Sequence, residues 1–182
     1  MALSSSVFTF EIDLADADRG VYEHLDLRVA RHPSESDGFL VARVLAYCLE
    51  FAEGIAFSRG LSDADDPPIA IRDLTGALQA WIDVGTPSAE RLHRAAKMSP
   101  RVAVYVHKEH AQWLASLEGA KIHRAADVEL RAIERGLIGG LVTALERRMS
   151  FALSVAEGEI FVSLGDRTIS GKVERLVLAS RP

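Results

Sequence analysis

The sequence predicts a mixed α/β (α+β) fold in which helices flank a mixed β-sheet. Near both ends of the chain, apolar and polar residues alternate with the period of two that is typical of half-buried strands. Between these ends, the patterns follow one another as helix, three strands, helix and strand. A chain of 182 residues with 48% hydrophobic and 26% charged residues is expected to form one domain over residues 1–182.

The strands at the two ends are expected to be antiparallel. Residues 7–14 and 24–30 are predicted to form a long hairpin around the turn ADADRG. Residues 151–155, 160–164 and 169–178 are predicted to form a terminal meander that turns at EG and GD. These N- and C-terminal antiparallel strands therefore frame the central αβββαβ segment.

The central segment is delimited by helix-start signals. Ser34, Ser36 and Asp37 favour a helix start in the loop RHPSESDG, and Thr86 is predicted to cap the next helix with Pro87 at its first position. The nearly continuous apolar run RVAVYVH predicts a strand buried on both faces. The other predicted elements are strands at 55–58, 69–73, 78–84 and 127–133, and helices ending near 98, 117 and 148.

The composition and charge of the chain argue against some classes of function. The formal charge of −5 argues against a general nucleic-acid coat, although a nuclease needs a positive surface only in its groove. No apolar run approaches the ~20 residues that span a bilayer, so no membrane partner is expected. The one cysteine, Cys48, lies on an apolar helical stripe, which favours a buried structural thiol and a cytoplasmic location.

Several tracts resemble the YaeQ family along the whole chain. They are ARHPSES, AYCLEFAEGI, FSRGLSDADDP, the pair DLTG and WIDVGTP, and the later QWL. The resemblance implies a bacterial protein with a PD-(D/E)XK nuclease-like, restriction endonuclease-like αβββαβ core. In that superfamily an acid after proline and an acid-x-Lys on the next strand hold Mg²⁺ beside a phosphate, so Mg²⁺ is the cofactor it implies.

Hairpin register locates the corresponding positions here. If the tight turn centres on Thr75-Gly76, facing residues sum to about 151, and Asp83 lies opposite Pro68. The superfamily pattern places its proline-acid pair at Pro67-Pro68, so the acid is replaced by proline. The lysine position holds Gly85. Asp73 would lie roughly 17 Å from Asp83 at ~3.3 Å per residue, and is interpreted as a turn residue.

Neighbouring residues could replace the missing groups. The candidate metal ligands are Asp83, Asp66, Glu35 and Glu50, and the candidate catalytic residues are Asp83, Glu35 and Lys97. Each also has an ordinary interpretation. Asp83 ends a strand, Asp66 lies in an acidic loop with Asp63, Glu50 suits a helix surface, and Glu35 suits a helix start. Lys97 suits the negative end of a helix dipole.

Two functions remain open from the sequence. The first is a non-catalytic protein whose degenerate nuclease-type cleft binds nucleic acid or a protein partner, which the missing acid and lysine favour. The alternative is a Mg²⁺-dependent nuclease or phosphodiesterase that uses Asp83 with substitute acids. No CxxC, HExxH or paired-histidine tract supports a zinc site.

Overall fold

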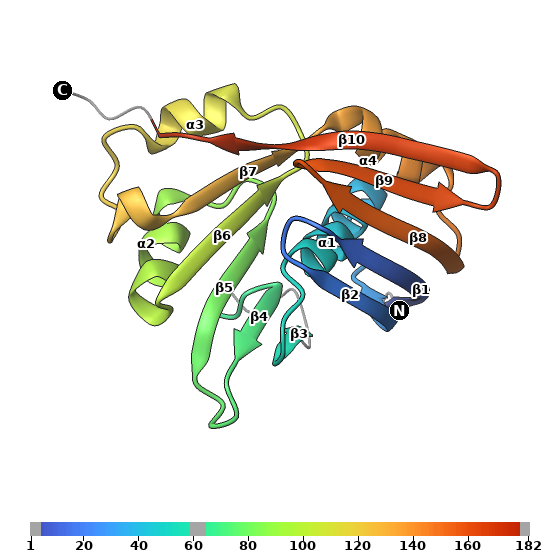
Figure 1. Ribbon diagram of the computed structural model, residues 1–182. Coiled ribbons are helices and arrows are strands. Elements are labelled where there is room, and N and C mark those ends of the chain that lie inside the picture. Colours follow the sequence, from blue (N-terminus) through green and yellow to red (C-terminus); the bar gives the residue numbers. More distant parts are fainter. Residues whose placement is uncertain (1–4, 59–64, 179–182) are drawn as a thin grey trace.

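The computed structural model describes residues 5–58 and 65–178. Its ten strands form one sheet in the order β2-β1-β8-β9-β10-β7-β6-β5-β4-β3 (Figure 1). The strands are β1 (Ser6–Asp16), β2 (Val21–Arg31), β3 (Ile55–Phe57), β4 (Ile69–Arg72), β5 (Leu78–Val84), β6 (Arg101–Val106), β7 (Glu129–Ile133), β8 (Arg148–Ala156), β9 (Glu159–Leu164) and β10 (Arg167–Leu176).

Four α-helices and one short 3-10 turn connect the strands. They are α1 (Asp37–Leu49), α2 (Ala89–Met98), α3 (Ala111–Leu117), the 3-10 turn Ala125–Asp127 and α4 (Arg135–Thr143). Among the described residues, no helix is both long and apolar enough to cross a membrane.

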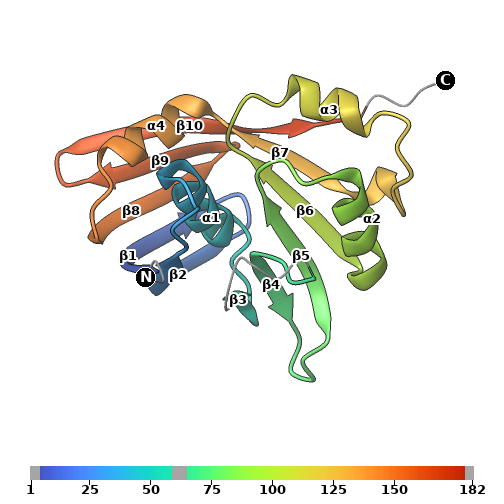
Figure 2. The same cartoon turned by 180° about the vertical axis from the view of Figure 1, so that it is seen from behind.

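The sheet bends so that its two halves face each other across α1 (Figures 1 and 2). Helix α1 contacts α4, β3, β5 and β6. Its apolar residues join those of the terminal strands in the larger core. A second core lies on the other face of β5, β6 and β7, where apolar residues of α2 and α3 cover the sheet. The central parallel strands are therefore covered on both faces, as parallel sheets require.

The predicted terminal strands are confirmed. β1 and β2 form an antiparallel hairpin, and β8, β9 and β10 form an antiparallel meander. β6 is buried along nearly its whole length, as its apolar run predicts. The sequence did not predict that β1 pairs in parallel with β8, or that β10 continues the sheet by pairing with β7. These contacts join the two ends of the chain to its centre.

The central order α1-β3-β4-β5-α2-β6 is present as predicted, but the predicted start of α2 and the predicted end of α4 were wrong. Ser88, rather than Thr86, caps α2, because its side chain accepts a hydrogen bond from the Arg91 amide at 3.2 Å. Helix α4 ends at Thr143 and not near 148, where β8 begins. Ser36 does cap α1, accepting from the Phe39 amide at 3.1 Å. The middle of the predicted acidic loop, residues 59–64 with Asp63, lies outside the described residues.

Candidate functional site

A cleft of about 690 Å³ lies where β5 and β6 end and α1 begins. The carboxyl ends of neighbouring parallel strands meet at one edge of a sheet, and this is where α/β proteins commonly place ligands. Its charged and polar lining comes from the α1 start, the end of β5, the first turn of α2 and the loop after β6. The lining includes Glu35, Phe39, Pro68, Asp83, Gly85, Arg91, His107, Lys108 and Glu109.

The Asp83 carboxylate is bound by two side chains of the protein itself. Arg91 donates from Nε to Oδ2 at 2.7 Å, and Trp81 donates from its indole nitrogen to the same oxygen at 3.1 Å. The guanidinium also lies over the Trp81 ring, 5.2 Å from its centroid. The side chain of Asp83 is 4% exposed and that of Arg91 24%. Asp83 therefore has a fixed counter-charge on the side of the sheet that α2 covers.

The predicted register of the β4–β5 hairpin is confirmed. Ile69 pairs with Ile82, so the next position places Pro68 opposite Asp83, and both line the cleft. Asp73 is a turn residue, whose carboxylate accepts from the Thr75 and Ala77 amides. No acid occupies the position across the hairpin from Asp83.

Gly85, where the resemblance led us to expect a lysine, has a backbone conformation that suits glycine. Its φ is +92°, in the left-handed region that L side chains rarely adopt. A Cβ added there would lie 3.7 Å from the Phe39 ring. A lysine at this position would therefore carry backbone strain, since only glycine adopts this φ without penalty.

Glu35 forms a buried ion pair inside the wall of the cleft. Arg43 Nη2 lies 3.0 Å from one carboxylate oxygen and donates to the other at 3.1 Å, and the two side chains are 1% and 3% exposed. The backbone amide of His32 also donates to Glu35, at 3.1 Å. Burial raises the pKa of Glu35, and the Arg43 charge partly opposes this shift. Burial likewise lowers the pKa of Arg43, against the opposing effect of Glu35.

The loop after β6 supplies the remaining polar groups. His107 is only 5% exposed, and neither ring nitrogen has a hydrogen-bond partner among the described residues. Its ring packs edge-on against Phe39, and burial lowers its pKa to about 4, so the imidazole is neutral at pH 7. Glu109 accepts from the amides of His110 and Ala111 at the start of α3. Lys108 is exposed at the rim and forms no ion pair with any described residue.

The structure brings two of the candidate residues, Glu35 and Asp83, to this cleft. Asp66 lies beside it. Its backbone oxygen accepts from Arg91 Nη2 at 3.1 Å, and its carboxylate lies 3.8 Å from Arg72. Lys97 is exposed near the end of α2 and does not line the cleft.

Glu50 lies at the other end of α1 from Glu35. Fifteen helical steps of 1.5 Å would separate them by roughly 22 Å, too far to share an ion. The Glu50 carboxylate accepts from Arg101 at 2.6 and 3.1 Å and from the Tyr105 hydroxyl at 2.7 Å. Within the parts of the chain that the structure describes, no three His, Cys, Asp or Glu side chains are placed to hold a metal ion.

Sequence reasoning missed both arginines that bind the candidate acids. Arg43 is a lone charge in the otherwise apolar helical segment FLVARVLAYCL, and a buried arginine needs a partner. Arg91 follows Asp83 by eight residues and lies in the first turn of α2. The isolated charge was a usable signal in the first case. In the second, the error in the start of α2 hid the direction of the side chain.

The comparisons with known proteins cover nearly the whole chain. The family model described as YaeQ protein matches residues 1–173. The chain belongs to the YaeQ family. YaeQ of Salmonella typhi is 27% identical and YaeQ of Escherichia coli strain K12 is 26% identical, each over 90% of this chain and 91% of the relative.

Two solved YaeQ structures share the fold. The crystal structure of YaeQ from Pseudomonas syringae has a TM-score of 0.85 and 29% identity, covering 95% of this chain and 96% of that one. The structure from Xanthomonas axonopodis pv. citri has a TM-score of 0.81 and 26% identity, covering 98% and 100%. The ten-stranded architecture with α1 between the halves is thus a YaeQ-family fold.

Proposed function

We propose that this YaeQ-family chain is a non-catalytic relative of the PD-(D/E)XK nucleases that binds nucleic acid in the β5–β6 cleft without cleaving it. The observation that carries the proposal is the closed ion pair between Asp83 and Arg91, with Nε 2.7 Å from Oδ2. A catalytic Mg²⁺ needs unpaired carboxylate oxygens. Here the carboxylate of Asp83, at the end of β5, is paired with Arg91.

Three further features support the loss of catalysis. Pro68 stands opposite Asp83 where the superfamily pattern has its second acid. Gly85 occupies the lysine position with a backbone that a lysine would strain. Glu35 is neutralised by Arg43 inside the cleft wall. The central order α1-β3-β4-β5-α2-β6 supports the nuclease relationship itself.

The cleft retains features that suit a phosphate backbone. Lys108 lies at its rim, exposed and without an ion pair to any described residue. Because the chain carries a net charge of −5, nucleic acid would be attracted locally at this cleft and not over the whole surface. An exposed lysine such as Lys108 is enough for one phosphate contact, which positions a nucleic acid without reading its bases.

Binding can be tested by fluorescence anisotropy with labelled single-stranded and double-stranded oligonucleotides at several salt concentrations. Lys108→Gln removes one charge at the rim, and Lys97→Gln removes one exposed charge away from the cleft. We expect Lys108→Gln to weaken binding and to reduce the salt slope by about 0.9 on duplex DNA, with Lys97→Gln unchanged. No binding by the wild type, or equal losses in both variants, would contradict the proposal.

Catalysis is tested separately, by incubating the same oligonucleotides with the protein and Mg²⁺ or Mn²⁺. We expect no cleavage product. Metal-dependent cleavage that disappears in Asp83→Asn would replace this proposal with the second candidate, a Mg²⁺-dependent phosphodiesterase. The observation favouring that candidate is that Glu35 and Asp83 line one cleft, with Asp66 beside it. In that case Asp83 and Glu35 would hold the ion, with Lys97 outside the site.

The ion pair gives this second candidate a direct test. Arg91→Gln removes the counter-charge from Asp83, so calorimetry should detect Mg²⁺ or Mn²⁺ binding in this variant if the carboxylate is otherwise able to hold an ion. The double variant Arg91→Gln, Asp83→Asn should then bind none. Arg94→Gln is a suitable control, since Arg94 lies on the same helix and pairs instead with Asp65 and Glu90.

A further inference from the structure

A second cavity, of about 580 Å³, lies at the opposite end of α1 from the nucleic-acid cleft. It lies between the two halves of the sheet, where the β1–β2 and β8–β9 turns approach β7 and β10 (Figure 1). Leu49, the last residue of α1, forms part of its wall. Nothing in the proposed function of the first cleft uses this cavity.

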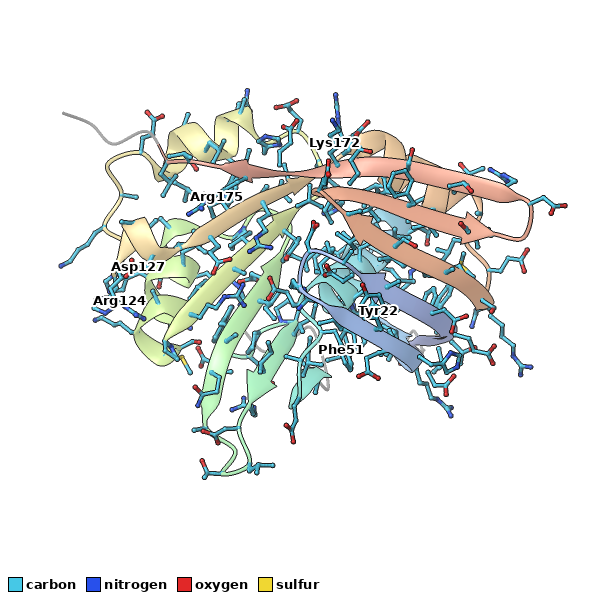
Figure 3. All side chains as sticks on the ribbon, in the orientation of Figure 1. Tyr22, Phe51, Arg124, Asp127, Lys172 and Arg175 are labelled. Carbon is cyan, nitrogen blue, oxygen red and sulfur yellow. The ribbon has the colours of Figure 1, made fainter. Side chains whose placement is uncertain are left out.

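Two arginines point into the cavity from neighbouring strands. Arg131 on β7 and Arg175 on β10 are direct partners in the antiparallel ladder, so their side chains leave the sheet on the same face. Figure 3 shows Arg175 on β10 beside β7, and both arginines line the cavity. Like charges placed directly opposite each other destabilise a sheet unless an anion lies between them.

The two guanidinium groups differ in how they are held. Arg131 donates to Glu129 at 2.6 Å and to the Tyr105 hydroxyl at 3.2 Å, and it lies over the Tyr105 ring, 5.7 Å from its centroid. Arg131 is therefore oriented in advance, yet it keeps free N–H groups. The side chain of Arg175 makes no hydrogen bond or ion pair with any residue that the structure describes.

The acids around the cavity are mostly engaged elsewhere. Asp16 binds Arg19 at 2.7 Å. Asp18 accepts from the backbone amides of Glu157 and Gly158 in the β8–β9 turn. Glu129 is shared between Arg131 and Arg101, which binds it at 2.7 and 3.0 Å.

One acid on the cavity wall, Asp127, is not engaged in this way. Asp127 is exposed on the 3-10 turn before β7, and its side chain forms no bond or ion pair with the described residues (Figure 3). Arg175 is therefore paired with no acid in residues 5–58 and 65–178. In the cavity, Arg131 is held in place by its partners, and Arg175 beside it has no ion-pair partner among the described residues.

We propose that this cavity binds a small molecule carrying a phosphate group, which Arg131 and Arg175 hold together. Two adjacent guanidinium groups suit a phosphate, because each offers a planar pair of donors to its oxygens. Val155, Ile160 and Val173 supply an apolar wall for the rest of the ligand. A volume of about 580 Å³ is within the size range of small-molecule sites, which combine apolar walls with a few converging polar groups.

The test is calorimetric titration of the full chain with inorganic phosphate, glycerol 3-phosphate and acetate. The phosphate compounds should bind more tightly than acetate, and glycerol 3-phosphate more tightly than inorganic phosphate, since it also reaches the apolar wall. Arg175→Gln should weaken phosphate binding about tenfold, the equivalent of one lost charged contact.

Arg167→Gln is the matched control. Arg167 is exposed at the far end of the same strand, outside the cavity, and its loss changes the net charge equally. Arg175→Gln should also leave the unfolding temperature unchanged or raised, because it removes the opposed charge, so weaker binding would not reflect misfolding. No phosphate binding by the wild type, or an equal loss in Arg167→Gln, would overturn the proposal. Lys108→Gln should not affect phosphate binding here, which keeps the result separate from the nucleic-acid cleft.

Discussion

The two ends of α1 carry buried acids that are neutralised in different ways. At the N-terminal end, each acid has its own arginine eight residues further along the chain, as Glu35 has Arg43 and Asp83 has Arg91. At the C-terminal end, Glu50 shares Arg101 with Glu129, and its partners come from strands 51 and 55 positions away. In the first arrangement, each carboxylate forms a separate ion pair with one arginine. The second forms a connected network in which Arg131 retains donors beside a cavity.

The difference bears on what each end can do. A carboxylate closed by a single arginine is unavailable to a metal ion, which supports binding without catalysis at the N-terminal cleft. In the network, the charges of Glu50 and Glu129 are balanced by those of Arg101 and Arg131. Arg175, next to this network, has no side-chain partner among the described residues. The protein therefore combines a cleft whose acids are paired with arginines and a cavity in which Arg175 has no ion-pair partner among the described residues.

The largest loss of stability is expected from breaking the most buried ion pair, that between Glu35 and Arg43. Glu35→Gln leaves the Arg43 charge without a counter-charge at 3% exposure, and breaking such a pair costs about 3–5 kcal/mol of the free energy of unfolding. Urea denaturation monitored by tryptophan fluorescence would measure it. Asp37→Asn is the control, since Asp37, two residues after Glu35, is also paired with an arginine, Arg31, but is 46% exposed. It should cost less than about 1 kcal/mol, and an equal loss in both variants would show that burial does not distinguish these pairs.

The network at the other end of α1 should be less sensitive to the same change. Glu50→Gln removes the charge that Arg101 and Tyr105 share, but Arg101 is 34% exposed and keeps Glu129 as a partner. We therefore expect a loss of about 2 kcal/mol, below that of Glu35→Gln. Glu90→Gln, at a position 86% exposed, should be nearly neutral. If Glu50→Gln destabilised more than Glu35→Gln, the shared network would be the more tightly coupled of the two ends.

The sequence predicted features that depend on nearby residues, and it did not predict contacts between distant parts of the chain. The β4–β5 register followed from a short turn, so the pairing of Pro68 with Asp83 was predictable. The burial of Cys48 followed from helical periodicity, and burial raises the pKa of its thiol to about 12. Both features depend on residues close together in the chain. The parallel pairing of Thr9 with Arg148 does not, and no local pattern specifies it.

The partner of Asp83 was missed for a physical reason. The sequence placed the cap of α2 at Thr86, whereas Ser88 is the cap. Side chains on an α-helix turn by about 100° per residue, so an error of two residues misdirects Arg91 by about 200°. Alternation correctly placed Asp83 and Trp81 on one face of β5, but it could not show that α2 covers this face. The position of the acid was predictable, and its neutralisation was not.

The smallest effect concerns His107, the buried imidazole of the N-terminal cleft. Its pKa is lowered to about 4 by burial, against an ordinary value of 6.5 in the unfolded chain. Between these values the unfolded state binds a proton that the folded state does not, so stability should fall as the pH decreases from about 6.5 to about 4. Glu35, whose pKa burial raises, acts in the opposite direction over part of this range, so the contribution of His107 is seen in a difference between variants.

His107→Phe keeps the ring contact with Phe39 and removes the titrating group. Relative to the wild type, the variant should gain stability progressively as the pH falls through this window, with no further change below about pH 4. NMR titration of the histidine rings gives the direct check. His24, which is exposed on β2, should titrate above its ordinary value because its hydrogen bond to Asp13 raises its pKa, whereas His107 should still be neutral at pH 5. A His107 ring that titrated near 6.5 would contradict this prediction and would mean that water from the cleft reaches the imidazole.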